Sequence, residues 1–416
     1  MYDPYAEFTK YTLLNGLDVY FAHWDRPWVG VEIVVHSGAR EDSIGKSGLA
    51  HFVEHTVNEN VPGFKHDDVR EFFDTVGGRV GFGSTGYLAT AYGFAIPAKV
   101  DIFRKALSIF GSMLLEAQIQ KNIENERKVI LREFNGKFPI AERVKWNLEV
   151  QKALFNGHRL ENYVRPIGLP MDFLSITEAD LQGFYDKYYT PKNMSLVVLG
   201  GLSIEAIISE IQNSPFGMKK EGERNAIPNV LQNFPVVTDH MTMISLSNYV
   251  SFKVDQAEFR AKWSFPAKFS EQTRRVFNLV LGMLLTEEIR EKRGLAYSIS
   301  TNYTYFQDVC DWVINGNVSP ESIPHIDELI QDCISMVPSR RDIFDRKLSS
   351  CLLRCEMIDL SGETLVKDSA GDITSYQKII TMQQIWEQLN EVRFEQMEEA
   401  AAFLSADRKC TFITCP

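Results

Sequence analysis

The chain lacks two features that would place it at a membrane or on nucleic acid. No run of apolar residues approaches the roughly 18–20 needed to cross a bilayer. Basic residues are not in excess, since 44 Lys+Arg against 55 Asp+Glu give a formal net charge of −11. An acidic surface disfavours binding to a phosphate backbone. We therefore expect no membrane span and no nucleic-acid partner.

Cysteine is scarce and shows no metal-binding or redox pattern. The six cysteines all lie in the second half, and none forms a C-x-x-C pair. The first ten residues contain neither a basic leader nor an apolar segment of the kind that directs secretion. We expect a cytoplasmic protein with reduced, mostly buried thiols, and neither a disulfide framework nor a zinc knuckle.

What is present is the composition of an ordinary globular protein. Hydrophobic residues make up 44% and charged residues 24% of the 416 residues, which excludes a disordered or fibrous chain. At roughly 100–200 residues per domain, this length predicts two to three domains.

The order of strand and helix patterns occurs twice along the chain. In the first half, β-prone runs at 11–21 and 29–36 precede helices at 47–59 and 67–76, a strand at 89–96, helices from 99 to 156, and a strand at 194–199. In the second half, strands at 241–252 and 257–265 precede a helix at 270–292, a strand at 296–316, helices over most of 319–404, and a closing strand at 409–414. This order predicts an α+β protein with an internal duplication.

The domain prediction follows from that order. Residues 1–213 form an N-terminal domain, 214–240 a linker rich in Asn, Pro, Gly and Lys, and 241–416 a C-terminal domain.

One short motif carries the strongest chemical signal. In Gly48-Leu-Ala-His-Phe-Val-Glu-His55, the residues His51 and His55 are four positions apart, so on a helix both imidazoles project from one face. That spacing suits two ligands of one Zn²⁺, and Glu54 is placed to act on a water at the metal. The pattern H-x-x-E-H reverses the commoner H-E-x-x-H zinc motif. The alternative to a zinc site is a pair of histidines in an amphipathic helix that bind no metal.

A catalytic zinc site needs a third protein ligand and one open position. The predicted helix 122–134 offers Glu124, Glu126 and Glu133. The chemistry of these carboxylates does not choose among them, and a solvated helix carboxylate is the usual alternative for each.

The motif, with Ser37-Gly-Ala-Arg-Glu41 before it, resembles the pitrilysin family of zinc metallopeptidases, in particular its short bacterial-type relatives of the mitochondrial processing peptidase. The resemblance implies two homologous α/β sandwich domains, each a mostly antiparallel sheet covered by helices, that form one half of a clamshell chamber. It also implies a third ligand roughly 70–80 residues after the motif. Glu124-Asn-Glu-Arg-Lys-Val-Ile130 matches the family's helix, with Glu124 as the ligand, 69 residues after His55.

The second half contains another family segment, Arg290-Glu-Lys-Arg-Gly-Leu-Ala-Tyr297. The resemblance implies that Arg290 and Tyr297 contact bound substrate. The alternative interpretation is a charged helix end that Gly294 terminates. The family also implies that substrate adds as a strand along residues 81–85, although this stretch also reads as a plain Gly-rich turn.

Three positions depart from the family pattern. The family has a second Glu seven residues before the ligand Glu, and position 117 of this chain is Ala. Gly81 replaces an Asn in the substrate strand, and residues 56–60 differ from the usual continuation of the motif. These changes bear on turnover and on substrate preference.

The resulting hypothesis is a zinc-dependent endopeptidase. His51, His55 and Glu124 hold Zn²⁺, Glu54 is the general base, and Tyr297 and Arg290 contact peptide substrates. A homodimer that encloses the chamber is expected, with a heterodimer of related subunits as the alternative. One alternative is a weak or inactive peptide-binding subunit. The other is a different metal-dependent hydrolase, and the acidic charge and the missing G-x-x-x-x-G-K-[ST] loop disfavour this hydrolase.

Overall fold

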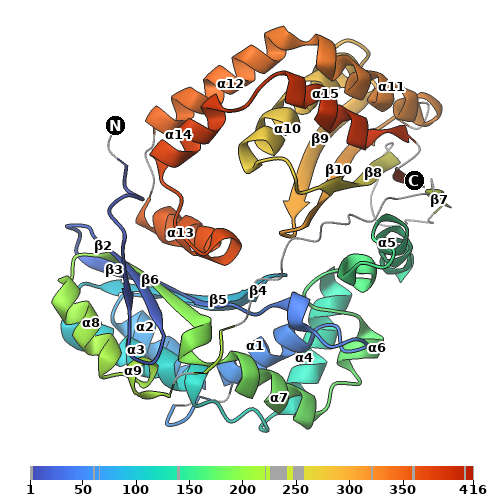
Figure 1. Cartoon of the computed structure of the whole chain (residues 1–416). Coiled ribbons are helices and arrows are strands. Elements are labelled where there is room, and N and C mark those ends of the chain that lie inside the picture. Colours follow the sequence, from blue (N-terminus) through green and yellow to red (C-terminus); the bar gives the residue numbers. More distant parts are fainter. Residues whose placement is uncertain are drawn as a thin grey trace. The chain divides into compact units, whose positions relative to one another are not determined.

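The computed structural model of the chain describes residues 3–59, 61–64, 66–137, 141–220, 222–224, 241–246, 257–319, 322–357, 361–406 and 409–415. These residues form two compact units, each built around one sheet (Figure 1). Over the part of the chain that is described, no helix has the length and apolar character required to span a bilayer.

The first unit contains a six-stranded sheet in the order β1-β2-β6-β3-β5-β4. Its strands are β1 (Thr9–Thr12), β2 (Asp18–His23), β3 (Trp28–Val35), β4 (Arg79–Thr85), β5 (Thr90–Pro97) and β6 (Met194–Gly200). Strands β2 and β6 are parallel and the other pairs are antiparallel. Strand β6 is buried at every position, which explains its continuous apolar sequence. Strand β4 is an edge strand.

Helices cover both faces of this sheet. They are α1 (Leu49–Glu59), α2 (His66–Thr75), α3 (Val100–Leu115), α4 (Ile123–Lys137), α6 (Pro170–Phe173), α7 (Glu178–Tyr188), α8 (Ile204–Gln212), α9 (Pro215–Met218) and α13 (Gly362–Tyr376), with short 3-10 turns η1 (Ala39–Glu41) and η3 (Pro191–Asn193). Helices α3, α8 and α9 lie on one side, whereas α13 lies on the other side against β3 and β6 (Figure 1).

The second unit contains a five-stranded sheet in the order β7-β11-β8-β10-β9. Its strands are β7 (Met241–Leu246), β8 (Ala257–Pro266), β9 (Ala296–Tyr305), β10 (Val309–Val318) and β11 (Cys410–Cys415). The pair β7–β11 is parallel and the rest are antiparallel, which repeats the arrangement β2-β6-β3-β5-β4 of the first sheet. The predicted α+β class with two related sheet domains is confirmed.

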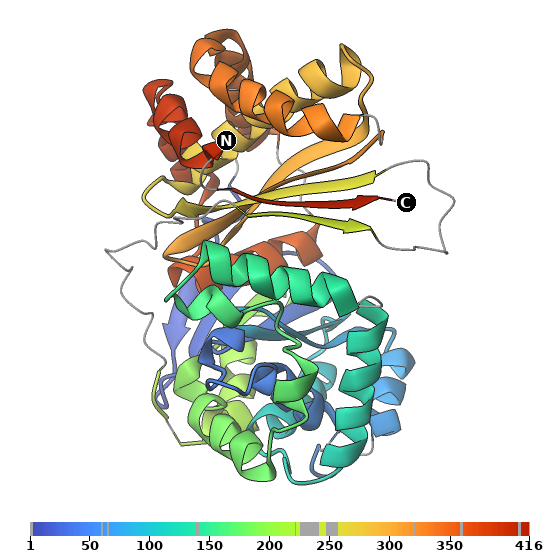
Figure 2. The same cartoon turned by 90° about the vertical axis from the view of Figure 1, so that its right-hand side faces the viewer.

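The helices of the second unit are α5 (Ala141–Leu154), α10 (Glu271–Leu285), α11 (Ile323–Met336), α12 (Arg341–Glu356), α14 (Met382–Asn390) and α15 (Glu395–Ala401), with a π-helical turn η4 (Thr286–Glu291) and 3-10 turns η2 (Arg159–Asn162), η6 (Val337–Ser339) and η7 (Ala402–Leu404). Helix α5 lies against β7 and β11, across the sheet from α10 (Figure 2).

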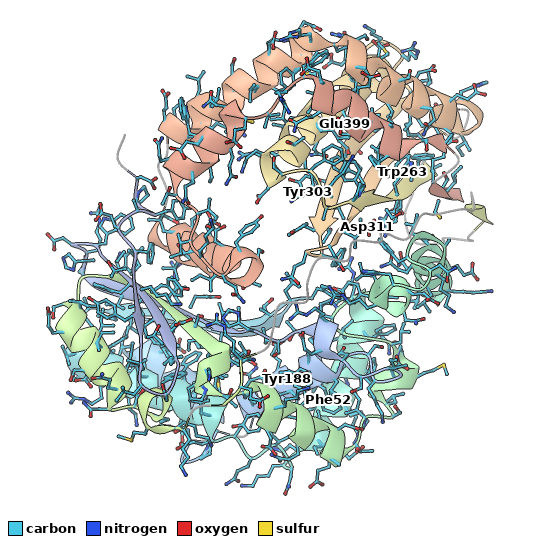
Figure 3. The ribbon with its side chains drawn as sticks, in the orientation of Figure 1. Phe52, Tyr188, Trp263, Tyr303, Asp311 and Glu399 are labelled. Carbon is cyan, nitrogen blue, oxygen red and sulfur yellow. The ribbon has the colours of Figure 1, made fainter. Side chains whose placement is uncertain are left out.

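Aromatic side chains fill the core of the second unit. Trp263 and Trp312 are fully buried, and the ring of Tyr303 stacks on that of Trp312 with centroids 5.0 Å apart. Trp263 and Tyr303 are labelled in Figure 3, as is Phe52, which fixes α1 in the core of the first unit. Five described cysteines are buried and free, as predicted, while the side chain of Cys415 lies outside the described residues.

The predicted domain boundaries differ from the compact units in two segments. Residues 140–162, including α5, belong to the second unit, and residues 359–381, including α13, belong to the first. Helix α5, from the first half of the sequence, therefore belongs to the unit of the second sheet, and α13, from the second half, belongs to the unit of the first sheet. Of the predicted linker, 215–218 form α9, where Pro215 packs against Gly111 of α3, whereas 225–240 lie outside the described residues.

Candidate metal centre and active site

Helix α1 presents the H-x-x-E-H motif from a fixed position. The backbone N–H groups of Gly48 and Ala50 donate to the two carboxylate oxygens of Asp42 at 2.7 and 2.8 Å, which satisfies donors at the start of the helix. Gly48 has a φ of +92°, and a Cβ there would lie 2.5 Å from the carbonyl oxygen of Ile167. The motif helix therefore begins where the half-buried carboxylate of Asp42 and a close backbone approach define its first turn.

Three side chains converge in the arrangement of a metal site. One ligand atom from each of His51, His55 and Glu133 lies within 4.8 Å of the others. The Oε2 atom of Glu133 is 3.6 Å from Nε2 of His51 and 3.4 Å from Nε2 of His55. Two ligands about 2.0–2.2 Å from one tetrahedral zinc ion are roughly 3.4 Å apart. The described donor set therefore has the composition and the spacing of a zinc site.

The hydrogen bond of His55 adds an argument from tautomers. Its Nδ1 lies 3.1 Å from Oε2 of Glu126, and a carboxylate only accepts, so Nδ1 carries the proton. In the neutral ring the lone pair of Nε2 then faces the carboxylate of Glu133. Two acceptors at this distance need a proton or a cation between them. These residues thus fit a bound divalent ion, and Glu126 fixes the ring that would hold it.

The charges of the histidines follow from their surroundings. Burial, together with the nearby His55, lowers the pKa of His51 to about 4, so this ring is neutral at pH 7 and can act as a ligand. Burial also opposes charge on His55, but the hydrogen bond to Glu126 and the nearby carboxylates outweigh it, and the pKa of His55 is raised. Although burial works against it, Lys137 and the two histidines lower the pKa of Glu133 and keep it ionised.

Glu54 lies between the motif helix and the edge strand β4. Thr85 Oγ1 donates a 2.6 Å hydrogen bond to Glu54 Oε2. At Gly83, whose φ is +143°, a Cβ would lie 2.6 Å from Glu54 Oε1. Burial raises the pKa of Glu54, while the bond from Thr85 and the proximity of His55 oppose the rise. A buried carboxylate with a raised pKa is suited to accept and return a proton near neutral pH.

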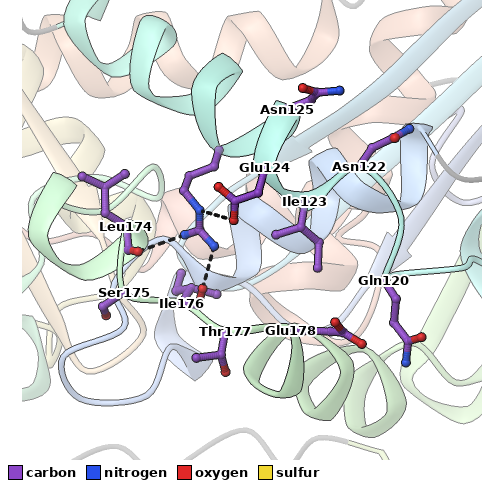
Figure 4. Close-up of a pocket in the computed structure, with 11 residues that line it drawn as sticks. Gln120, Asn122, Ile123, Glu124, Asn125, Leu174, Ser175, Ile176, Thr177 and Glu178 are labelled. Atoms are coloured by element: carbon purple, nitrogen blue, oxygen red, sulfur yellow. Dashed lines mark hydrogen bonds and ion pairs between the residues drawn. The ribbon is translucent and has the colours of Figure 1, made fainter.

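Glu124 is not part of this cluster, so the predicted third ligand is corrected. Its side chain is 77% exposed and pairs with Nε of Arg127 at 3.2 Å (Figure 4). Glu124 and Glu133 are nine residues apart, or roughly 180° around a helix with 3.6 residues per turn. Since Glu133 faces α1, Glu124 faces away.

The correction also removes one departure from the family pattern. With Glu133 as the ligand, the position seven residues earlier is Glu126, not Ala117. Seven residues are nearly two turns, so Glu126 and Glu133 project from one face of α4. Glu126 is buried and bonds to His55. Glu133 also lies inside the roughly 70–80-residue interval after the motif, a signal from which sequence reasoning could have found it.

The two substrate-contact candidates lie in the second unit. Arg290 is exposed in η4, and Tyr297, on the edge strand β9, is 74% exposed. Residues 81–85 of the predicted substrate strand belong to β4, so this stretch is an edge strand with a register shift between Gly81 and Ser84, not a turn.

Two family models match successive parts of the chain. The model for insulinase (peptidase family M16) matches residues 22–162, and the model for the peptidase M16 inactive domain matches residues 175–338. The chain belongs to peptidase family M16. The resemblance to pitrilysin-type zinc peptidases is confirmed, and the M16 match that covers the motif also covers Glu126 and Glu133.

Individual M16 proteins extend the comparison. The chain is 25% identical over 254 residues to the probable zinc protease PqqL of Escherichia coli, which covers 56% of this chain and 27% of PqqL. It is 24% identical over 323 residues to the uncharacterized zinc protease Rv2782c of Mycobacterium tuberculosis, covering 74% and 68%. The chain thus spans about a quarter of the length of PqqL.

A solved structure matches almost the whole chain. The crystal structure of the first half of the periplasmic protease PqqL from Escherichia coli aligns with a TM-score of 0.80 at 15% identity, covering 98% of this chain and 92% of that one. At this identity the likeness concerns the fold alone, and it shows that the M16 fold extends from the first unit through the second.

Replacing Glu133 or Glu124 by Gln will show which carboxylate holds the metal. We expect Glu133→Gln to lose most of its zinc, because it removes one of three ligands, and Glu124→Gln to keep about one zinc per chain. Mass-spectrometric metal analysis after gel filtration measures this. Zinc retained by Glu133→Gln and lost by Glu124→Gln would restore the original prediction.

Glu126→Gln tests the support of His55. The amide can still accept from Nδ1 but carries no charge, so we expect zinc affinity to fall by about 10–100-fold, as for other groups that orient metal ligands. Competition with a zinc-binding dye gives the affinity, and Glu124→Gln is the matched control on the same helix. Affinity equal to the wild type would show that the Glu126 charge plays no part.

Proposed function

We propose that this M16 protein is a zinc-dependent endopeptidase that hydrolyses peptides or short unfolded polypeptides. The observation that carries the proposal is the cluster of His51, His55 and Glu133 beside Glu54. A scaffold subunit has no use for a carboxylate held at this place by Thr85.

The chain's own residues divide the chemistry. Zinc held by His51, His55 and Glu133 would supply a Lewis acid and lower the pKa of water toward about 7. Glu54, held at Oε2 by Thr85, accepts the proton of the attacking water and returns it to the leaving amine. Tyr297 donates to the oxyanion, a contribution of about 3–4 kcal/mol for such donors, and Arg290 holds the substrate backbone.

The edge strand β4 supports a mode of substrate binding. Among the described strands it pairs with β5 alone, which leaves its outer edge to accept a peptide as an added strand. Backbone pairing tolerates varied sequences, as an endopeptidase requires. Gly83 places Glu54 directly against this strand.

A homodimer would complete the active site. We propose that two copies enclose a chamber and that each presents Arg290 and Tyr297 to the zinc of the other, since two-fold symmetry is the commonest arrangement of homo-oligomers. A heterodimer with a related subunit is the alternative. In this proposal residues 1–213 and 241–416 are the duplicated domains, and the repeated strand order supports the duplication.

A weak or inactive M16 subunit is the second candidate function. The model named for an inactive domain matches residues 175–338, which contain none of the proposed metal ligands. The apparent loss of the supporting Glu at Ala117 no longer favours this candidate, because Glu126 fills that role. The cytoplasmic location stays a prediction, since the structural relative PqqL is periplasmic.

Glu54→Gln should separate metal binding from catalysis. We expect the variant to keep its zinc and to cleave a quenched fluorescent peptide about 10²–10⁴ times more slowly, because the amide cannot accept the proton. Glu205→Gln, an exposed change of the same kind on α8, is the control. Wild-type cleavage by Glu54→Gln would refute the role of Glu54, and a zinc-loaded wild type that cleaves no peptide would favour the inactive subunit.

Mixed dimers will test the shared site. A Glu54→Gln subunit combined with an Arg290→Ala/Tyr297→Phe subunit restores one complete site per dimer if the partner supplies Arg290 and Tyr297. We expect up to about half of the wild-type activity per mixed dimer, measured after tandem-tag purification of heterodimers. Purified mixed dimers as inactive as either parent would contradict a site built from two copies.

A further inference from the structure

The first unit contains a groove that the proposed zinc chemistry does not use. This groove, which we call the Glu32 groove, has a volume of about 840 Å³, within the range of ligand sites. Residues of β3, β5 and β4 form its floor, and Ser361 to Lys367, at the start of α13, form its wall. Figure 1 shows α13 on the side of the sheet away from α3. The floor is paved with small residues: Gly30, Gly81, Ala91, Gly93 and Ala95.

Glu32 is the acidic group on this floor. In the register of the sheet it pairs with Gly93 of β5, which in turn pairs with Gly81 of β4. A Cβ at Gly93 would lie 2.3 Å from Glu32 Oε2. The carboxylate therefore lies across Gly93 toward the edge strand, and only glycine at position 93 leaves room for it.

The nearby cationic side chains, Lys367 and Arg79, form ion pairs with Glu363. Glu363 of α13 accepts from Lys367 at 2.8 Å and from Arg79 at 3.4 Å. Glu32 has no hydrogen bond or ion pair to any described residue. Burial raises the pKa of Glu32 to about 7, with Glu363 adding to the rise and Lys367 opposing it. The groove thus contains a carboxyl group without an ionic partner among the described residues, whose ionised form a bound cation would stabilise.

The wall beside Glu32 is apolar. Trp28 and Val366 lie over Gly30, on the same face of β3, with atoms 3.4 and 3.6 Å from a Cβ built there. A Lys or Arg side chain suits such a site, since its methylene stem packs on apolar surface while its charged end reaches a carboxylate.

The groove and the proposed catalytic centre share strand β4. Gly83 and Ser84 of β4 line it, and Gly83 also lies against Glu54. A peptide added to the edge of β4 would direct alternate side chains to the two faces of the sheet. Side chains on one face would then enter the groove.

We propose that Glu32 is a specificity-determining residue that binds the side chain of a Lys or Arg residue in the peptide substrate. The identity of the ligand as a substrate rests on the proposed function. The carboxylate contacts a part of the peptide away from the bond that is cut, so it sets which peptides bind and not how fast the bond breaks.

Binding without cleavage is the direct test. The zinc-loaded full chain with Glu54→Gln is titrated with two fluorescent, N-acetylated peptides that differ only in one Lys or norleucine, with this position moved along a set of otherwise neutral sequences. We expect at least one register in which the Lys peptide binds roughly tenfold or more tightly. Adding Glu32→Gln should abolish this preference and leave the norleucine affinity unchanged, whereas Glu205→Gln should change neither.

A pH series distinguishes direct contact from a structural effect. With Glu32 present, the Lys peptide should bind more tightly as pH rises through about 7, because the carboxylate loses its proton. With Glu32→Gln the same curve should be flat, while the neighbouring Lys367, Glu363 and Arg79 remain. Equal zinc content and equal melting temperature of the two variants exclude misfolding.

Three results would overturn the proposal. The first is equal binding of Lys and norleucine peptides in every register, and the second is a Lys preference that survives Glu32→Gln. The third, measured with the same peptides carrying free instead of acetylated amino termini, is a preference that appears only in the free-amine peptides, which would assign the site to the terminal ammonium. A wild type that cleaves peptides while Glu32→Gln leaves the Lys preference intact refutes this inference alone. A wild type that binds Lys peptides through Glu32 but cleaves none refutes the proposed function alone.

Discussion

The burial of polar side chains on helix α1 is the constraint on which the site depends. His51 and Glu54 are buried, and His55 is largely so. Buried polar groups cost stability unless each finds a partner. The partners come from two directions, Glu126 and Glu133 from α4 and Thr85 from β4. One helix therefore ties the metal ligands to the edge strand where a peptide would lie.

Strand β4 is irregular where it contacts Glu54. Its register shifts between Gly81 and Ser84, and Gly83 adopts a φ of +143° that side chains other than glycine rarely tolerate. The glycines weaken the strand in isolation. They let the carboxylate of Glu54 approach the backbone on one side and keep the groove open on the other.

Much of this arrangement could be predicted from the sequence, and the failures have physical causes. The motif helix and the strand at 29–36 follow from local periodicity, and the structure has them as α1 and β3. The segment 296–316, predicted as a single strand, is a hairpin. The prediction missed its turn because the sequence near Gln307, where φ is +73°, has no Gly or Asn-Gly signal. Helices α5 and α13 pack on sheets that their positions in the sequence do not indicate, since tertiary contacts decide where an amphipathic helix is buried.

The choice of Glu124 failed for a different reason. It relied on the match of α4 to a sequence pattern. The position of each residue around the helix axis decides which face it occupies, and Glu126 and Glu133 share the face that meets α1. The groove was beyond sequence reasoning, because Glu32, Gly93 and Gly81 become neighbours only through the strand register.

The repeated topology explains why the chemistry is gathered in one unit. Helix α10 follows β8 as α1 follows β3, yet its interior positions from Val276 to Leu285 are apolar, including Phe277, Val280 and Leu281. It can bury that face against β10 and β9 without polar partners, and it packs among the rings around Trp312. On the edge strand β9 of the same unit, Tyr297 is exposed. The two related sheets thus carry different helices: α1 buries His51 and Glu54, which need polar partners, whereas α10 buries a mainly apolar face from Val276 to Leu285.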